Sequence, residues 1–413
     1  MVNKSEIIWN TLGSFVESLL SAVLLMFCTR LNGTEIAGMF SISFATATIL
    51  NAIGDFGIRI YQVTDTKRVY KFGDYLISRI IVVLCMSAIG IAFISLTGYT
   101  AEKLWICIAL ILFKVIDNLS ETFQGEFQLR NRLDLGGKSM VIRVSSALIM
   151  FLIVDLITKN VIASALSLTL TNLVLFILWD VRILNGFEKI QLNFDKINVK
   201  KILLECLPLA ISTMLSLYII NATKYAIDNF GDYTMQTYFN VIYMPTFVIN
   251  LVSAFVIKPF LKPFGDFWNN KEYFKFIKSI IVIILILGLA TIGIDIACAL
   301  LGVPVLSLIY GIDLAPYKME MILLVVSGFF YAAATVMLYA LSTIRKQKLT
   351  TVAYIITAIL AFVVSNLCVE KWQMKGAIVS NMVTTVTLFV LLIVFFLFEL
   401  NKEKNRKLEK IDT

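Results

Sequence analysis

Twelve long apolar segments alternate with short polar loops along this chain of 413 residues. Backbone groups in hydrocarbon must be hydrogen-bonded within their own segment, so an apolar run of roughly 20 residues predicts a membrane-spanning helix. Hydrophobic residues make up 59% of the chain and charged residues only 15%, which is far from the composition of soluble domains. We therefore predict an all-α polytopic membrane protein with spans at residues 7–29, 35–60, 74–97, 104–126, 139–157, 160–182, 202–226, 236–257, 276–299, 318–342, 350–368 and 376–399.

The basic residues lie mostly on one set of alternating loops, the set that includes both chain ends. Of the 36 lysine and arginine residues, the opposite set holds only Arg30, Lys103, Lys159, Lys224, Lys318, Lys371 and Lys375, and Lys114 falls inside the fourth span. Cytoplasmic loops are the ones enriched in lysine and arginine. We expect a multi-pass protein of the cytoplasmic membrane with both termini in the cytoplasm. The net charge of +8 is then a signal of membrane topology and not of nucleic-acid binding.

The residue content argues against an enzyme, a metal site or a bound cofactor. There is no histidine, which removes the commonest metal ligand and the usual proton shuttle, and the six cysteines show no close pairing. Gly137, Lys138 and Ser139 resemble the end of a phosphate-binding loop, but that motif needs a glycine where this chain has Arg132. With no ATPase motif, transport has to be driven by an ion gradient, the membrane potential or the substrate gradient.

The chain is predicted to consist of two six-helix lobes. We expect an N-terminal lobe over 1–182, a polar cytoplasmic linker over 183–201, and a C-terminal lobe with a basic tail over 202–413. Weak matches at a constant offset, such as Phe40 with Phe239 and Arg59 with Lys258, favour a duplicated bundle whose halves have the same orientation. The drift of the offset later in the chain requires an insertion, for which the loop near 300–317 is the candidate.

Polar and ionisable side chains recur at three- and four-residue steps in four of the spans, which places them on one face of each helix. Such a stripe must face protein or water, so the four stripes predict a wet cavity. The stripes are Asn10, Ser14, Glu17 and Ser21; Ser41, Thr48, Asn51, Asp55 and Arg59; Lys114, Asp117, Glu121, Gln124 and Gln128; and Asn221, Lys224 and Asp228.

Each charged group has a purely structural interpretation as well. Asp55 with Arg59, and Lys114 with Asp117, have the spacing of ion pairs within one helix. Lys224 and Asp228 near the outer surface fit a solvated pair. Glu17 has no cation on its own helix face, so it is a candidate for ion coupling, as are Asp117 and Glu121.

The repeat places Arg59 and Lys258 at equivalent cytoplasmic ends of the second and eighth spans. Two cations there suit a phosphate or pyrophosphate headgroup, because arginine binds such oxygens bidentately and lysine supplies a point charge. The alternative is that both only mark the cytoplasmic side. Our candidate substrate-binding residues are Arg59, Lys258, Asp55, Lys114 and Lys224.

Three stretches resemble bacterial polysaccharide repeat-unit flippases of the multidrug/oligosaccharidyl-lipid/polysaccharide exporter superfamily. They are Ile8–Gly13, Asp55–Arg59, and Gln124–Asp134 with the Gly137–Ser139 and Arg143 that follow. The resemblance implies a V-shaped pair of six-helix lobes, as in MATE transporters, that turns a polyprenyl-pyrophosphate-linked oligosaccharide across the membrane by alternating access. It also implies that helices one, two, seven and eight line the cavity, although helix eight offers few polar residues.

We therefore expect a flippase for capsule or O-antigen assembly. Its partners would be the lipid-linked oligosaccharide, membrane lipids and other polysaccharide-assembly proteins. One alternative is a drug/cation antiporter of the same superfamily, which would need a compact ion-binding carboxylate pocket. The other is a membrane glycosyltransferase or polysaccharide polymerase, against which the chain has no Asp-x-Asp pair and no long outer loop.

Overall fold

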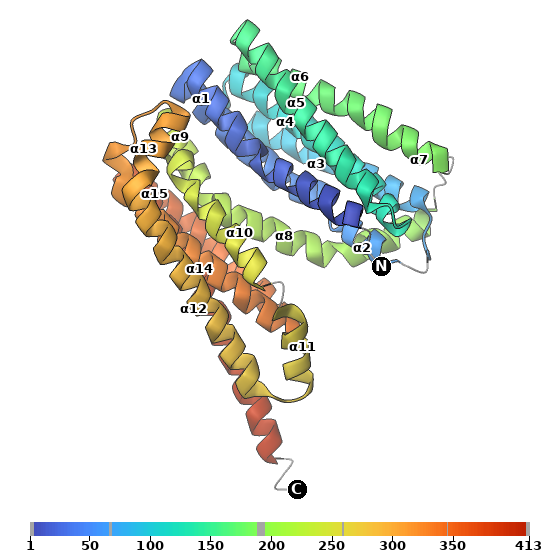
Figure 1. The fold of residues 1–413 in the computed structure, drawn as a ribbon, viewed down its shortest axis with the longest axis vertical. Coiled ribbons are helices and arrows are strands. Elements are labelled where there is room, and N and C mark those ends of the chain that lie inside the picture. The colour runs from blue at the N-terminus through green and yellow to red at the C-terminus, as the bar shows by residue number, and fades with distance from the viewer. Residues whose placement is uncertain (1–3, 66–67, 188–194, 258–259, 345, 410–413) are drawn as a thin grey trace. The chain divides into compact units, whose positions relative to one another are not determined.

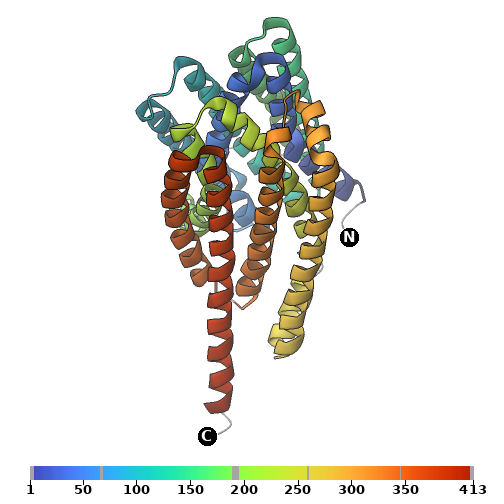
Figure 2. The same cartoon turned by 90° about the vertical axis from the view of Figure 1, so that its left-hand side faces the viewer.

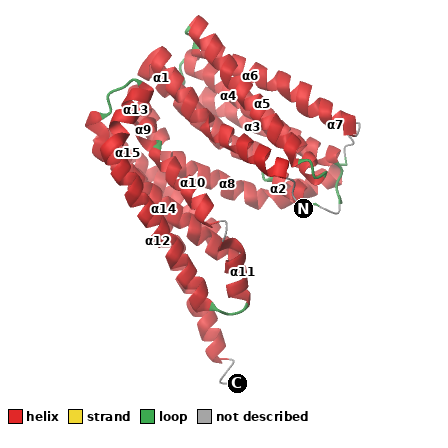
Figure 3. Cartoon of the chain, viewed as in Figure 1, coloured by secondary structure: helices red, strands yellow, loops and turns green. Residues whose placement is uncertain are grey.

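The computed structural model describes residues 4–65, 68–187, 195–257, 260–344 and 346–409. Across these residues the chain forms helices and short loops, with no strand (Figure 3). The predicted all-α class is confirmed. By their contacts the residues form two units, unit 1 over Met1–Leu217 and unit 2 over Tyr218–Thr413.

Unit 1 is a bundle in which α1 packs against α3, α4 and α5, and α6 packs against α4 and α5 (Figure 1). Its helices are α1 (Lys4–Asp55), α2 (Ile58–Thr64), α3 (Phe72–Leu96), α4 (Ala101–Leu129), α5 (Leu133–Thr158), α6 (Val161–Leu175), the π-helix η1 (Phe176–Val181) and α7 (Arg182–Phe187). Side-chain caps start two of them. The hydroxyl of Thr100 accepts from the backbone of Lys103, and the side chain of Asn160 accepts from Ile162 and Ala163.

The first two predicted spans form one continuous element, α1, which is two helices joined at Gly33. Gly33 has φ 86°, a left-handed conformation that glycine adopts without steric cost. A second interruption follows at Phe56 (φ 48°) and Gly57 (φ 70°), between α1 and α2. The predicted second span 35–60 is therefore broken just before its C-terminal end, which changes how its last residues face their neighbours.

Unit 2 contains α9 (Tyr233–Tyr243), α10 (Pro245–Ile257), α11 (Leu261–Asn269), α12 (Tyr273–Ala297), the π-helix η3 (Cys298–Gly302), α13 (Val303–Tyr310), the 3-10 helix η4 (Ala315–Tyr317), α14 (Lys318–Thr343) and α15 (Gln347–Glu409). α15 is again two helices, joined at Gln373 (φ 50°), and Figure 2 shows its two halves side by side in red. The stretch 300–317, expected to be a loop, is largely helical. Its apolar run Val303–Tyr310 continues from η3 and ends at Gly311, whose φ of 73° closes the helix.

Seven helical runs in the described residues are long and apolar enough to cross a membrane. Two of them, Ile8–Val63 and Lys348–Lys402, are 56 and 55 residues long, and each contains the interruption that separates two predicted spans. A helix of about 20 residues already spans the hydrocarbon, so each run accommodates two spans. The chain is a multi-pass membrane protein, and the number twelve stays a prediction.

The boundary between the units falls inside one helix, α8 (Lys196–Phe230). Its N-terminal part belongs to unit 1, where Ile202 and Cys206 pack with Ile58, Tyr75 and Val82 in a buried cluster. Its C-terminal part belongs to unit 2, where Thr223 contacts Ser380. The predicted division into 1–182, 183–201 and 202–413 remains a prediction about the repeat, and residues 188–194 of that linker lie outside the described residues.

Candidate functional site

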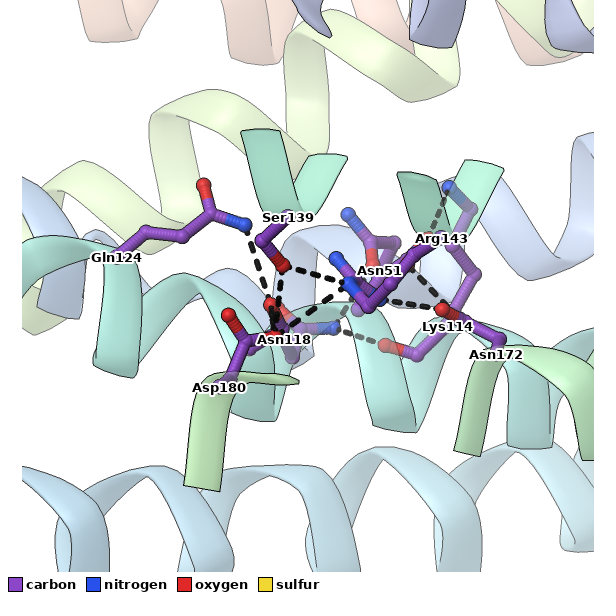
Figure 4. Close-up of polar contacts among 10 residues, drawn as sticks. Asn51, Lys114, Asn118, Gln124, Ser139, Arg143, Asn172 and Asp180 are labelled. Carbon is purple, nitrogen blue, oxygen red and sulfur yellow. Dashed lines mark hydrogen bonds and ion pairs between the residues drawn. The ribbon is translucent and has the colours of Figure 1, made fainter. Parts of the chain in front are cut away.

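Two connected sets of polar side chains occupy the interior of unit 1, and Figure 4 shows residues of the first set together with Asn118. We call the first the Arg143 network; it consists of Lys114, Asp117, Ser120, Gln124, Ser139, Arg143, Asn172 and Asp180. We call the second the Arg79 network; it consists of Asp55, Arg79, Asn118, Glu121 and Thr122. Asn118 links them, because its amide oxygen accepts from Arg79 and its amide nitrogen donates to the backbone oxygen of Lys114.

Lys114 and Asp117 form the ion pair that their spacing predicts. The two side chains come from successive turns of α4, and Lys114 Nζ lies 3.3 Å from Asp117 Oδ2. Lys114 also lies 5.8 Å from the ring centroid of Phe44 on α1 and 5.3 Å from that of Phe113. The other carboxylate oxygen of Asp117 faces Arg143 of α5 at 3.3 Å and Asn172 of α6 at 3.1 Å. Asp117 therefore joins three helices instead of standing free for an ion.

Arg143 is only 2% exposed and connects α4, α5, α6 and η1. Its Nε donates to Ser139 Oγ at 3.2 Å and lies 3.5 Å from Asp180 Oδ2, while its Nη1 donates to the side-chain oxygen of Asn172. Asp180 is fully buried, and its Oδ2 also accepts from Ser120 at 2.8 Å and Ser139 at 2.9 Å. Asp180 belongs to the π-helix η1, a type of segment often found at functional sites.

Arg79 of α3 is fully buried and holds the end of α1. Its Nη1 donates to the backbone oxygens of Gly54 at 2.6 Å and Asp55 at 2.7 Å, which are carbonyls that the interrupted helix leaves without helical partners. The same guanidinium lies 3.7 Å from the Asp55 carboxylate and 3.8 Å from that of Glu121. A cation here also complements the negative end of the α1 dipole.

Asp55 and Arg59 do not form the pair within one helix that was the structural alternative. Their spacing would bring them together only on a continuous helix, and the left-handed residues Phe56 and Gly57 separate them. Asp55 pairs with Arg79 instead. Arg59, on α2, is partly exposed and interacts electrostatically with Glu121 and Glu17, but it takes no part in the salt bridges that Arg79 forms.

Glu17 of α1 is partly buried beside the Arg143 network. Its carboxylate interacts electrostatically first with Lys114, then with Asp117 and Arg143, and more weakly with Arg59. The prediction that its own helix face supplies no cation agrees with this arrangement, since Lys114 and Arg143 come from α4 and α5. A change in the charge of Glu17 would therefore alter the electrostatic energy of Lys114, Asp117 and Arg143.

The loop between α2 and α3, which follows Arg59, is organised by Asp65. Its carboxylate accepts from the backbone of Val69 at 2.9 Å and Tyr70 at 3.0 Å, and from the hydroxyl of Tyr75 at 3.0 Å. Desolvation by partial burial raises the pKa of Asp65, but these hydrogen bonds outweigh it and the net pKa is lowered. The stability that Asp65 contributes is thus present above its unfolded-state pKa and is lost as the pH falls through the lower folded-state value.

Among the predicted site residues of unit 2, Lys224 is the one that the structure describes. Lys224 of α8 lies 5.9 Å from the ring centroid of Tyr243 on α9, so it has an aromatic neighbour within unit 2. α9 also carries the buried amides Gln236 and Asn240. Lys258 lies outside the described residues, so the predicted Arg59 and Lys258 clamp stays an expectation from the sequence.

Sequence reasoning missed three members of the networks. Arg79 and Arg143 were counted among the basic residues of the cytoplasmic loops, yet their side chains are buried between helices, and Asp180 was not singled out. A signal was available: Arg143 lies inside the apolar run 139–157, and Asp180 lies inside 160–182. An ionisable residue within a span is itself a candidate for a functional or structural role.

The fold and the apolar helical runs are those of a multi-pass membrane protein, and comparisons with known proteins agree with this class. No family model matches the chain. It is 24% identical over 399 residues to the capsular polysaccharide biosynthesis protein CapF of Staphylococcus aureus, covering 93% of this chain and 97% of that protein.

Solved structures share its fold. An inward-facing multidrug resistance MATE family transporter of the MOP superfamily matches with a TM-score of 0.72 at 11% identity, over 97% of this chain and 99% of that one. The lipid II flippase MurJ in an inward closed conformation matches with a TM-score of 0.69 at 11% identity, over 94% and 87%. The predicted MATE-like fold is confirmed, and the similarity to CapF agrees with the resemblance drawn from the sequence.

Proposed function

We propose that this protein is a flippase that moves a polyprenyl-pyrophosphate-linked oligosaccharide across the cytoplasmic membrane by alternating access, for the assembly of a cell-surface polysaccharide. The observation that carries the proposal is the similarity to CapF, which spans 97% of a protein named for capsular polysaccharide biosynthesis. The fold shared with the lipid II flippase MurJ supports the same class of reaction. The protein would act as a transporter without a catalytic residue, a cofactor or a metal ion.

Arg59 is the residue of unit 1 that we assign to the pyrophosphate headgroup. Asp55 and Glu121 are engaged by Arg79, and Lys114 is engaged by Asp117, so those groups are neutralised by protein partners. Arg59 is partly exposed on the short helix α2 and outside those salt bridges. A guanidinium in that position can bind two phosphate oxygens at once. Asp55 and Lys114, first considered as substrate contacts, then serve to hold the site around Arg59.

Lys224 is the second cation that we assign to substrate. In unit 2 it lies beside Tyr243, and α9 carries the amides of Gln236 and Asn240. Aromatic rings and amides are suitable contacts for sugar rings and hydroxyls. Lys258 remains a candidate for the headgroup by its sequence position alone.

Glu17 is the carboxylate that we assign to coupling with an ion or proton. Asp117 and Glu121, the other two candidates, are committed to Arg143 and Arg79, so a change in their charge would first break helix contacts. Glu17 interacts with several charged groups of the network without a salt bridge of that kind. Both termini would lie in the cytoplasm, and the partners would be the lipid-linked substrate, membrane lipids and other polysaccharide-assembly proteins.

The test is to delete the gene and to measure both surface polymer and the lipid-linked oligosaccharide that remains in membrane vesicles. We expect the polymer to disappear and the intermediate to accumulate on the cytoplasmic leaflet, and the parent gene to reverse both. Arg59→Ala should fail to rescue at normal abundance. Arg68→Ala is the control, because Arg68 is a half-exposed basic residue on the following loop.

A deletion strain with normal polymer and no accumulated intermediate would exclude a role in polysaccharide export. If that strain instead became sensitive to cationic drugs, the protein would be an antiporter of the same superfamily.

A further inference from the structure

Arg79 stands apart from the other buried cations because it contacts both sides of one junction, a break in the backbone of α1 and the neighbouring helix α4. α1 ends at Asp55 and α2 begins at Ile58, and the intervening Phe56 and Gly57 both have positive φ. Phenylalanine adopts this conformation only at a steric cost, so the surroundings must hold it there. Membrane helices tolerate such breaks only where the freed backbone groups find partners.

The guanidinium of Arg79 supplies those partners and anchors them to α4. Its Nη1 donates to the carbonyls of Gly54 and Asp55, the last two residues of α1. Its Nε donates to Thr122 Oγ1 at 2.9 Å, and Nη1 also reaches Asn118 Oδ1 at 3.2 Å, both on α4. One side chain thus fixes the end of α1 against α4, with no exposure to solvent.

A lysine could not make this set of contacts. The guanidinium is planar and offers five donors in a fixed arrangement, whereas an ammonium is a single point with three donors. The contacts of Arg79 require donors on two different nitrogens that face two helices. The geometry is therefore specific to arginine.

We propose that Arg79 is the positioning residue of the substrate site: by holding the broken end of α1 it sets the direction of α2, and so it places Arg59. Arg59 is the second residue of α2, two positions after Gly57. Any rotation of α2 about the break moves the Arg59 guanidinium. This inference rests on the proposed role of Arg59, and Arg79 itself does not touch substrate.

The first experiment measures whether Arg79 fixes the direction of α2. Spin labels are placed on exposed sites of α2 and α3, Ile60→Cys and Leu84→Cys, in a parent whose six native cysteines are replaced, and their distance distribution is measured by double electron–electron resonance. We expect one narrow distribution in the parent and a broad or shifted one in Arg79→Lys. Arg182→Lys, the same substitution at an exposed arginine of α7, should leave the distribution unchanged.

The second experiment asks whether Arg79 acts through Arg59. Binding of a purified polyprenyl-pyrophosphate oligosaccharide is measured for the parent, Arg59→Ala, Arg79→Lys and the double variant, each reconstituted in lipid. We expect Arg59→Ala to weaken binding about tenfold. Arg79→Lys should weaken it about fivefold in the parent and less than about twofold when Arg59 is already alanine, because contributions that share a group are not additive.

Each outcome bears on the proposal. If the spin-label distance distribution is unchanged in Arg79→Lys, Arg79 does not fix the end of α1. If Arg79→Lys weakens substrate binding equally with Arg59 present and with Arg59 replaced by alanine, Arg79 does not act through Arg59. If Arg59→Ala binds like the parent, the proposed headgroup role fails, while the spin-label result still decides whether Arg79 fixes the break. Should Arg79→Lys fail to accumulate, Thr122→Val removes only the acceptor of Nε and should give the same changes at smaller size.

Discussion

At the scale of single residues, the interior of unit 1 is organised by ionisable side chains that are stable in a membrane protein only when they are paired. An ionisable side chain near the bilayer centre costs a few kcal/mol unless it is paired or hydrated, and Arg79 and Arg143 are each held by carboxylates and amides from other helices. The sequence predicted the polar stripe of α4 and the Lys114 pair, because both depend only on helical spacing. The charge rule for loops did not assign Arg79 or Arg143 to the interior, because it counts residue types and ignores the direction of a side chain, although both residues lie within predicted spans.

Glu17 provides a test of coupling at this scale. Glu17→Gln preserves the shape of the side chain but removes the charge that interacts with Lys114 and Arg143. We expect polymer export to fall by roughly tenfold or more, equivalent to about 1.4 kcal/mol of barrier, at normal protein abundance. The measurement is surface polymer per molecule of membrane protein in the deletion strain.

Glu35→Gln serves as the matched control, because Glu35 lies on the same element α1 with an exposed side chain. Normal export by an abundant Glu17→Gln protein would make Glu17 a structural residue. Equal losses in both variants would point to a general effect on α1 instead.

At the scale of elements, interruptions matter more than helix ends. Hydropathy located the apolar runs well, because length and composition determine whether a segment crosses the hydrocarbon. It did not locate the break at Phe56 and Gly57, since a Phe-Gly step inside an apolar run has no effect on hydropathy. The stretch 300–317 was expected to be a loop, yet its apolar residues continue the helix until Gly311.

Gly137, which resembles part of a phosphate-binding loop in the sequence, allows α5 to pack closely against α1. A Cβ at this position of α5 would lie 2.4 Å from the backbone carbon of Trp9 and 2.5 Å from the nitrogen of Asn10, on α1. Small residues permit such close approach of membrane helices. Gly137→Ala should therefore lower the free energy of unfolding by about 1–3 kcal/mol, the usual cost of overpacking.

The measurement for Gly137→Ala is the thermal unfolding midpoint in detergent, together with abundance in the membrane. Gly293→Ala is the matched control, because a Cβ at Gly293 in α12 meets no atom within 4 Å. If both substitutions leave the midpoint unchanged, α1 and α5 do not pack as closely at Gly137 as the structure places them.

At the scale of the whole molecule, the class could be predicted almost entirely from the sequence. Composition, alternation and charge asymmetry are global properties, and they predicted an all-α multi-pass membrane protein. The MATE-like fold, which the solved structures share, followed from the resemblance of three short stretches to a known family. The unit boundary was not predictable in the same way. The boundary falls within α8 because the first half of that helix packs on α2 and α3. The sequence pattern of α8 gives no sign of these tertiary contacts.

Topology is the prediction that belongs to this scale. Reporter fusions after Lys201 and after Lys410 should both report the cytoplasm, because the basic residues concentrate on that set of loops. Lys410 itself lies beyond the described residues. Paired alkaline phosphatase and fluorescent protein fusions measure the side directly, and a fusion after Lys159 should report the opposite side. An extracytoplasmic signal after either Lys201 or Lys410 would overturn an even number of spans before that point.

The buried arginines also impose an order on biosynthesis. Arg79 enters the membrane 39 residues before Asn118, and Arg143 enters 29 residues before Asn172. At about 5–20 residues per second, these two asparagines are translated on the order of seconds after the arginines that donate to them. Arg143 already has Asp117 behind it in the chain, whereas the α4 partners of Arg79 are still to come. The carbonyls of Gly54 and Asp55 already exist when Arg79 is made, so α3 can dock on the end of α1 while the ribosome completes α4. The two carbonyl groups at the break can therefore accept hydrogen bonds from Arg79 before α4 is complete. The break in α1 thus offsets the charge of Arg79 during insertion.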